Sequence, residues 1–317
     1  MIFLNFTAYK NEQLGVLPLQ TNELSLENCR CGQFDAIQSD VYEKSLCSKF
    51  ASARGPKQKI ISYTYFGSAE NILKYHFENI NYIVDRAKDV YSGWTVRLHL
   101  KKGNLENPYI WSTLCHLQCK KNNIDICVLE DLDDKEFNDF SDIQVNGRFW
   151  RFLPLLDPLV DIFISRDIDA FLLDREVAAV EEWMSSPYSY HILRDHPLHC
   201  GTMLAGLWGV KTANVRTSHY DQWVDFIYSQ VDYEKHWDQT LLQQKIYKLA
   251  RLDSMEHDSY CCKVMKGQHV RPFQVKRDQN GTWCGGGLNY LYQNKVILET
   301  PCPVKCRPKN HTDWVNC

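Results

Sequence analysis

Residues 159–169 read LVDIFISRDID, a nearly unbroken apolar run that ends in two aspartates. The run from Leu159 to Ser165 is short and rich in isoleucine and valine, which is the pattern of a strand buried on both faces. Open sheets built from such strands bind ligands outside the carboxyl ends of the strands. Asp167 and Asp169 therefore stand where a parallel sheet would carry a binding site.

Upstream of this strand, strand and helix patterns alternate along the chain. Apolar strand-like segments lie at 59–66, 94–100 and 124–129. Helix-like segments lie at 69–91, 108–121 and 149–156, and an amphipathic helix begins at Arg175-Glu176. Alternation at this spacing is typical of βαβ units. The sequence therefore predicts an α/β fold with a mostly parallel sheet flanked by helices.

The charge balance excludes some classes of partner. The 317 residues include 36 Lys and Arg and 39 Asp and Glu, a net charge of −3. Such a balance gives no basic surface for nucleic acid or for an anionic membrane. We therefore expect no nucleic-acid partner, and an anionic ligand would need a local site, which a metal ion can supply.

The cysteines gather near the end of the chain. There are 13 in all, and six of them follow residue 260: Cys261, Cys262, Cys284, Cys302, Cys306 and Cys317. A loop-rich segment with this many cysteines favours disulfides and hence a secretory compartment. A zinc site is the alternative, because Cys302 and Cys306 are loosely suitable in spacing, but no second pair of ligands follows at finger-like spacing. Since 13 is odd, at least one thiol is free or pairs with another chain.

Two carboxylates at positions i and i+2 can converge on one ion only if the chain turns after the strand. Carboxylate oxygens suit Mg²⁺ or Mn²⁺, which keep coordination positions open for phosphate oxygens. Such an ion neutralises a diphosphate leaving group. The alternative is that Asp167 and Asp169 are solvated or cap the next helix, and their spacing leaves both interpretations open.

The order of motifs resembles the GT-A glycosyltransferases, and glycosyltransferase family 8 in particular, over residues 59–275. In that family an Asp-x-Asp ends a central strand, and a strand with small residues follows against the donor sugar. A helix then begins with Asp-Gln, and a downstream histidine completes the metal site. The matching positions here are Asp167-Ile168-Asp169, residues 202–209 (TMLAGLWG), Asp238-Gln239 and His257.

The chain also departs from the family pattern. Leu204 stands where family 8 usually has Asn, and His257 lacks the Gly and Lys-Pro-Trp that normally follow. Residues 166–169, Arg175-Glu176 and residues 194–199 are similar to segments of an uncharacterised group of GT-A-like proteins.

The resemblance implies transfer of a hexose-type sugar, by default from a UDP-sugar donor, to a hydroxyl of a glycan or glycoprotein. It implies that Mn²⁺ or Mg²⁺ is held by Asp167, Asp169 and His257. The residues expected to bind the donor are Arg151, Arg166, Asp167, Ala205, Gly206, Lys211 and Gln239. Asp238 would lie beside the anomeric carbon of a retaining reaction, and Asp195 would be the carboxylate of an inverting one. Trp208 and Trp237 are expected against a sugar ring.

Several structural alternatives stay open. Arg151 and Arg166 could instead pair with Asp157 or Asp161, and Asp238 could simply cap the helix that follows it. The residues Gly285-Gly286-Gly287 are expected to form a turn, because no Lys-Ser/Thr follows to make a phosphate-binding loop. For the chain as a whole, the rivals are a metal-dependent nucleotidyltransferase and a non-catalytic glycan-binding module on the same scaffold.

We expect three parts: an N-terminal stem or cap over 1–57, the GT-A domain over 58–275, and a Cys-rich extension over 276–317. The apolar start, residues 1–6, is too short for a signal sequence or a membrane span. We expect the Golgi lumen, with membrane contact only through an N-terminal anchor missing from this chain. Sequons at Asn5, Asn280 and Asn310 support secretion weakly. A cytoplasmic protein with reduced cysteines is the alternative.

Overall fold

The computed structural model describes residues 44–75, 77–129, 147–228, 237–262, 269–287, 298 and 300–317. Its strands are β1 (Gln58–Tyr65), β2 (Thr95–Lys101), β3 (Ile124–Leu129), β4 (Val160–Arg166), β5 (Tyr190–Arg194), β6 (Leu207–Val210), β7 (Ser254–Asp258) and β8 (Val270–Arg271). Its main helices are α1 (Lys49–Ala53), α2 (Ala69–Tyr75), α3 (Asn79–Val90), α4 (Pro108–Lys120), α5 (Asp174–Met184), α6 (Thr212–Tyr228), α7 (Trp237–Leu241) and α8 (Tyr247–Ala250). Short helical segments are η2 (Lys102–Glu106), η4 (Trp150–Leu155), the π-helical η5 (Leu242–Ile246) and η6 (Val304–Cys306).

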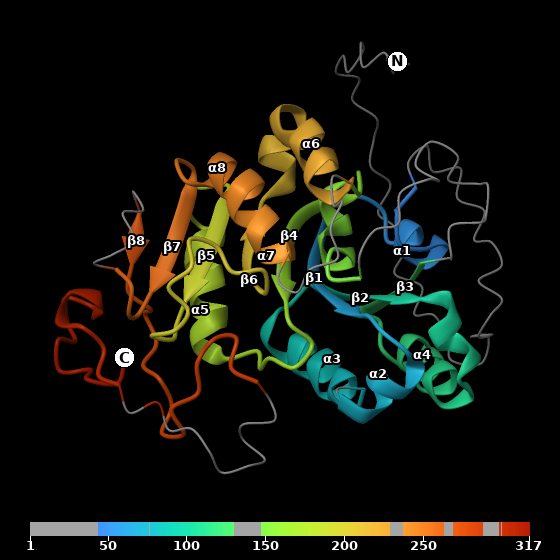
Figure 1. Cartoon of the computed structure of the whole chain (residues 1–317), viewed down its shortest axis with the longest axis horizontal. Coiled ribbons are helices and arrows are strands. Elements are labelled where there is room, and N and C mark those ends of the chain that lie inside the picture. The colour runs from blue at the N-terminus through green and yellow to red at the C-terminus, as the bar shows by residue number, and fades with distance from the viewer. Residues whose placement is uncertain are drawn as a thin grey trace.

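The described strands form one eight-stranded sheet in the order β3-β2-β1-β4-β6-β5-β7-β8 (Figure 1). Strands β1, β2, β3 and β4 are parallel to one another, and β6 runs antiparallel between β4 and β5. Strands β7 and β8 then continue parallel to β5. The predicted α/β class with a mostly parallel sheet is confirmed.

Two apolar layers cover the two faces of the sheet. One layer is formed by α3, α4 and α5, with α3 contributing Ile80, Ile83, Val84 and Ala87 at helical spacing. The other is formed by η4, α6 and the segment α7–α8, where Phe152, Trp208 and Phe226 meet. The strands between these layers are almost wholly buried, which is why their sequences read as continuous apolar runs.

One expected helix is divided in the structure. The pattern at 69–91 predicts a single helix, but α2 and α3 are separated near Phe77. The N–H of Phe77 donates to the carbonyl of Ile72 at 3.2 Å, and the buried Phe77 ring lies 6.0 Å from that of Tyr65 and 5.8 Å from that of Tyr109. Burial of this aromatic ring between two others therefore overrides the helical period.

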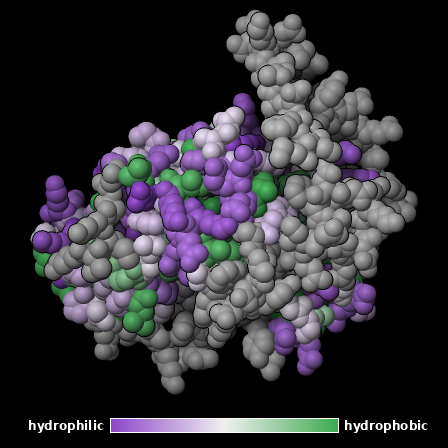
Figure 2. Space-filling view, turned by 45° about the horizontal axis from the view of Figure 1, so that its top comes forward, coloured by the Kyte–Doolittle hydropathy of each residue, from purple (hydrophilic) through white to green (hydrophobic). Residues whose placement is uncertain are grey.

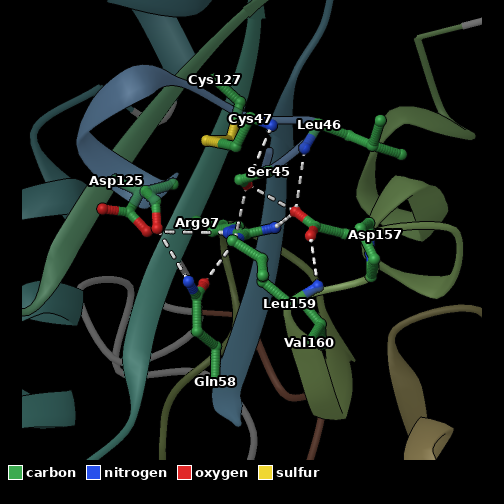
Figure 3. Close-up of polar contacts among 12 residues, drawn as sticks. Ser45, Leu46, Cys47, Gln58, Arg97, Asp125, Cys127, Asp157, Leu159 and Val160 are labelled. Atoms are coloured by element: carbon green, nitrogen blue, oxygen red, sulfur yellow. Dashed lines mark hydrogen bonds and ion pairs between the residues drawn. A yellow bond between two sulfur atoms is a disulfide. The ribbon is translucent and has the colours of Figure 1, made fainter. Parts of the chain in front are cut away.

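A buried ionic cluster lies at the amino ends of the parallel strands (Figure 3). Arg97 donates through Nη1 to the carboxylate of Asp157 at 2.6 Å and through Nη2 to Ser45 at 3.1 Å. Beside them, a disulfide joins Cys47 to Cys127. Removing one partner would leave a buried charge without compensation, which is strongly destabilising. The cluster therefore fixes the segment before β1 to the end of the sheet opposite the Asp-x-Asp motif.

Disulfides hold the C-terminal region together. The pairs are Cys200–Cys261, Cys262–Cys306 and Cys302–Cys317. Outside this region, Cys115 and Cys119 of α4 are disulfide-bonded as well. Among the described cysteines only Cys284 is free, and it is buried. The expectation that most cysteines after residue 260 form disulfides is confirmed, and Cys302 and Cys306 have different partners rather than sharing a zinc ion. The disulfides fit a secretory compartment.

The surface of the described residues is mixed in character. On the face in Figure 2, apolar residues lie in small groups among hydrophilic ones. None of the helices described is long and apolar enough to cross a membrane. The sequon residues Asn280 and Asn310 are exposed, whereas Asn5 lies outside the described residues.

Candidate functional site

The chain turns at the point where the Asp-x-Asp motif requires it. The N–H of Ala170 donates to the carbonyl of Asp167 at 3.0 Å, which closes a turn with Asp169 inside it. Asp167 directly follows β4, and β4 pairs with β1 on one side and with β6 on the other. From β1 the chain continues to β2 on the side away from β4, so the strand order switches direction between β1 and β4. Open α/β sheets bind their ligands at this switch point.

Arg151 joins two of the expected site residues. Its Nη1 donates to Oδ1 of Asp167, and its Nη2 donates to Oδ2 of Asp238 at 2.8 Å. Arg151 and Asp238 are buried, whereas 45% of the Asp167 side chain is exposed. Burial lowers the pKa of Arg151, but the two carboxylates outweigh it and raise that pKa above the ordinary value. The three charges sum to −1, and the group opens to solvent at Asp167.

The loop before β6 is held against Asp167 by two other side chains. Gln239 accepts from the N–H of Ala205 at 3.0 Å and donates to the carbonyl of Met203. Ser165 of β4 donates to the carbonyl of Ala205 at 2.7 Å. These bonds place Gly206 so close to Asp167 that a Cβ at position 206 would lie 2.0 Å from Oδ2. Of the expected donor-binding residues, the structure therefore brings together Arg151, Asp167, Ala205, Gly206 and Gln239.

The glycine run lies over the same turn. The N–H of Phe171 donates to the carbonyl of Gly286 at 3.3 Å, and Ala170 forms an isolated β-bridge with Gly287. Gly285 has a φ of +81°, which favours glycine, and it packs on Leu207 at the start of β6. The glycines therefore form the expected turn, and it braces the Asp167–Ala170 turn from outside.

Arg166 is not part of this cluster. Successive side chains of a strand point to opposite faces, and Arg166 turns away from the face of Ser165. Its Nε donates to Glu176 of α5 at 2.7 Å, and Tyr91 donates to the same carboxylate oxygen at 3.0 Å. Of the two alternatives for Arg166, the structure shows the buried ion pair, but its partner is Glu176 rather than Asp157 or Asp161.

Lys211 also lies elsewhere. Its ammonium donates to the backbone carbonyls of Trp183 at 3.0 Å, Met184 at 3.2 Å and Ser186 at 2.6 Å. These are carbonyls at the end of α5, where a cation complements the helix dipole. Burial lowers the pKa of Lys211. The side chain therefore caps a helix and does not reach the Asp-x-Asp turn.

His257 is part of a buried chain of polar side chains. Its Nε2 lies 3.1 Å from a carboxylate oxygen of Glu182, and its Nδ1 lies 2.9 Å from Nε2 of His191. The ring of His191 stacks on Trp183 at 5.1 Å. Burial lowers the pKa of His257 although Glu182 raises it. With both ring nitrogens engaged here, His257 is not positioned as a third ligand beside Asp167 and Asp169.

Asp195 is enclosed by donors on every side. Its Oδ1 accepts from Arg175 at 2.9 Å, from Ser259 at 2.7 Å and from Arg277 at 2.7 Å. Its Oδ2 accepts from the N–H of Cys284 at 2.9 Å, and the side chain has no exposed surface. A carboxylate held in this way anchors the C-terminal segment and has no free oxygen for an acceptor hydroxyl.

Of the two tryptophans expected against a sugar ring, Trp208 is the one whose side chain lies within the described part of the chain. Trp208 is fully buried, with its ring 5.8 Å from that of Phe152 and 5.2 Å from that of Phe163. It is a core residue, because β6 lies in the middle of the sheet. The side chain of Trp237 lies outside the described part of the chain.

One residue near the turn was not among the expected site residues. The pKa of His199 is lowered by burial. The charges of Asp167 and Asp195 act in the opposite direction and offset this shift only in part. Its buried Nδ1 has no hydrogen-bond partner within the described structure. The sequence signal for this residue is the pair His196 and His199 in the segment after Asp195.

The donor set at the turn fits a divalent ion only in part. Asp167 and Asp169 supply hard carboxylate oxygens, and Gly206 leaves room for the Asp167 carboxylate. Across the described residues, no three His, Cys, Asp or Glu side chains are grouped so as to hold a metal ion. Mg²⁺ is commonly bound by one or two carboxylates together with substrate phosphates. Two carboxylates at this turn would be compatible with an ion whose coordination is completed by a phosphate ligand.

No protein-family model matches this sequence, and no curated protein shows a significant match to it.

Proposed function

We propose that this protein is a glycosyltransferase of the GT-A type that transfers a sugar from a nucleoside diphosphate donor to a glycan or glycoprotein hydroxyl. The observation that carries the proposal is the Arg151 bridge. It brings a strand-end carboxylate, Asp167, together with a helix-start carboxylate, Asp238, outside the switch point of an α/β sheet. The two carboxylates belong to the two motifs that resemble family 8.

The protein's own residues would bind and orient the donor. Asp167 and Asp169 would hold a divalent ion against the diphosphate, and that ion would stabilise the negative charge on the leaving group. The backbone of Ala205 and Gly206 would approach the donor, because Gln239 and Ser165 fix this loop. A glycine at 206 permits a close approach of backbone and ligand.

The position of Asp238 suits electrostatic stabilisation of a positively charged sugar carbon. It is buried at the start of α7, and one of its oxygens accepts from Arg151 at 2.8 Å. A carboxylate held by a guanidinium stabilises positive charge on a neighbouring sugar carbon better than it removes a proton. This arrangement supports a retaining reaction, and the bonds of Asp195 to Arg277 and to the N–H of Cys284 do not favour that carboxylate as an inverting base.

Calorimetry with UDP, GDP and CDP, each with and without Mn²⁺, tests the proposal. We expect one of the three to bind in the presence of Mn²⁺. Asp167→Asn and Asp169→Asn should each abolish the Mn²⁺-dependent binding. Their melting temperatures should stay near that of the parent, because 45% of the Asp167 side chain is exposed and little packing is lost. Asp174→Asn is the matched control, since Asp174 is an exposed carboxylate paired with Arg86.

The same samples separate the rival functions. Binding of a nucleoside diphosphate followed by slow hydrolysis of its sugar conjugate supports the transferase. Binding of a glycan without any nucleotide would identify a glycan-binding module. Pyrophosphate release from a nucleoside triphosphate and a sugar phosphate would identify a nucleotidyltransferase.

A further inference from the structure

Arg151 fills the place beside Asp167 where a divalent ion would bring its positive charge. Its Nη1 already bonds Oδ1 of Asp167, and its Nη2 bonds Asp238 at 2.8 Å. The side chain is 9% exposed, so it cannot swing freely into solvent. A guanidinium does not lose its proton in proteins. An ion that arrives at Asp167 therefore meets a carboxylate that is already paired with a permanent cation.

The fixed charges of the group bear on which ligands it favours. Arg151, Asp167, Asp169 and Asp238 together carry −2. A divalent ion alone would compete with the guanidinium for Asp167 and would lie beside its positive charge. A diphosphate alone would add negative charges beside three carboxylates. An ion and a diphosphate that arrive together compensate each other, and the diphosphate offers the guanidinium a new acceptor in exchange for Asp167.

The guanidinium has a free donor for that exchange. Nε of Arg151 is buried and has no hydrogen-bond partner in the described structure. A buried donor without a partner costs free energy, which a new acceptor would recover. Nε–H lies on the same edge of the guanidinium as Nη2, whereas Nη1 lies on the other side, so Nε and Nη1 can donate to separate phosphate oxygens. Arg151 can therefore donate to a diphosphate while it stays bonded to Asp238.

We propose that Arg151 is an internal counter-ion that makes the binding of the divalent ion depend on the binding of the nucleoside diphosphate. The ion binds Asp167 only weakly by itself, because Nη1 of Arg151 already holds Oδ1 of that carboxylate and its positive charge repels the ion. With the diphosphate present, Arg151 transfers its Nη1 from Asp167 to a phosphate oxygen. This inference rests on the proposed function and adds to it a positioning residue and a coupled order of binding.

Thermodynamic linkage makes the proposal measurable in the parent protein. If the diphosphate raises the affinity for Mn²⁺ by some factor, Mn²⁺ raises the affinity for the diphosphate by the same factor. We expect this factor to be about a hundredfold, near the upper end of common coupling values. Free Mn²⁺ measured by electron paramagnetic resonance gives the ion's affinity with and without UDP. Calorimetry gives the UDP affinity with and without Mn²⁺.

Arg151→Gln removes the counter-ion and keeps a polar side chain. In this variant Mn²⁺ alone should bind about tenfold more tightly than in the parent, and the coupling factor should fall by about tenfold. Lys121→Gln is the matched control, because it removes one positive charge from an exposed ion pair with Asp85. The control should keep the parent's affinities.

The outcomes separate this inference from the proposed function. If Mn²⁺ alone binds the parent within threefold of its affinity in the presence of UDP, the counter-ion role is wrong, and this holds even if Arg151→Gln does not fold. Equal Mn²⁺ affinity in folded Arg151→Gln and in the parent would also overturn it. If no nucleoside diphosphate binds with or without Mn²⁺, the proposed function itself fails.

Discussion

The carboxylate of Asp167 lies directly against the backbone of Gly206. A Cβ at position 206 would come within 2.0 Å of Oδ2 and within 2.5 Å of the carboxyl carbon of Asp167. No side chain fits at such a distance, so the position of the carboxylate depends on a residue without a Cβ. Gln239 and Ser165 fix the loop and leave it little room to move away.

Gly206→Ala should therefore displace the Asp167 carboxylate into solvent. We expect about a hundredfold loss of turnover, the scale on which misplacing a reacting group by about 1 Å acts. Binding of Mn²⁺ with the nucleotide should weaken in parallel. Gly103→Ala is the control, because nothing lies within 4 Å of a Cβ at that position. Unchanged Mn²⁺–nucleotide affinity in folded Gly206→Ala would show that Asp167 is not a ligand.

Asp238→Asn tests the electrostatic role of the buried carboxylate. An amide keeps the shape but not the charge, so we expect about a hundredfold loss of turnover, the scale of one electrostatic contact in an active site. Donor binding should survive. Proton NMR of the first product formed reports the stereochemistry, for which we expect retention. A product of inverted configuration would contradict this assignment.

Asp195→Asn should lower the free energy of unfolding. The carboxylate is paired with Arg175 and Arg277 and has no exposed surface. Removing one partner from a buried ion pair costs about 3–5 kcal/mol of unfolding free energy. Chemical denaturation of the variant should show this loss, whereas Asp174→Asn, at an exposed ion pair, should change stability little. Full stability with abolished turnover would instead return Asp195 to a catalytic role.

Mild acid should destabilise the fold through its buried histidines. Burial lowers the pKa of His99 to about 3, and it lowers the pKa of His191 well below the ordinary value. In the unfolded chain a histidine takes up its proton below about pH 6.5, so the stability present above that pH is lost as the pH falls. For His99 alone the loss at pH 5 is about 2 kcal/mol.

Denaturant unfolding at pH 7.5 and at pH 5 measures this effect. His99→Gln carries no titrating group, so the difference between the two pH values should shrink by about 2 kcal/mol in this variant. An undiminished difference would assign the acid sensitivity to other groups.

The local pattern of apolar residues in the sequence was sufficient to predict the positions of the parallel strands. The expected segments 59–66, 94–100 and 124–129 correspond closely to β1, β2 and β3, and the apolar run before Arg166 is β4. These strands are buried on both faces, so burial leaves a continuous apolar signal in the sequence. A turn at the end of β4 was only a condition of the metal interpretation, which the spacing of Asp167 and Asp169 left open. The disulfide-bonded C-terminal region was implied by its cysteine content.

Only the tertiary structure decided which polar residues meet. Arg151 and Asp238 are 87 positions apart and lie together because β6 inserts antiparallel between β4 and β5, an order that no local pattern encodes. Arg166 adjoins Asp167 in sequence yet binds Glu176 inside the core. Lys211 binds the backbone carbonyls at the end of α5, and His257 contacts the carboxylate of Glu182. Hydrophobic periodicity is a property of neighbouring residues, whereas the partner of a charged side chain depends on the whole arrangement of the sheet.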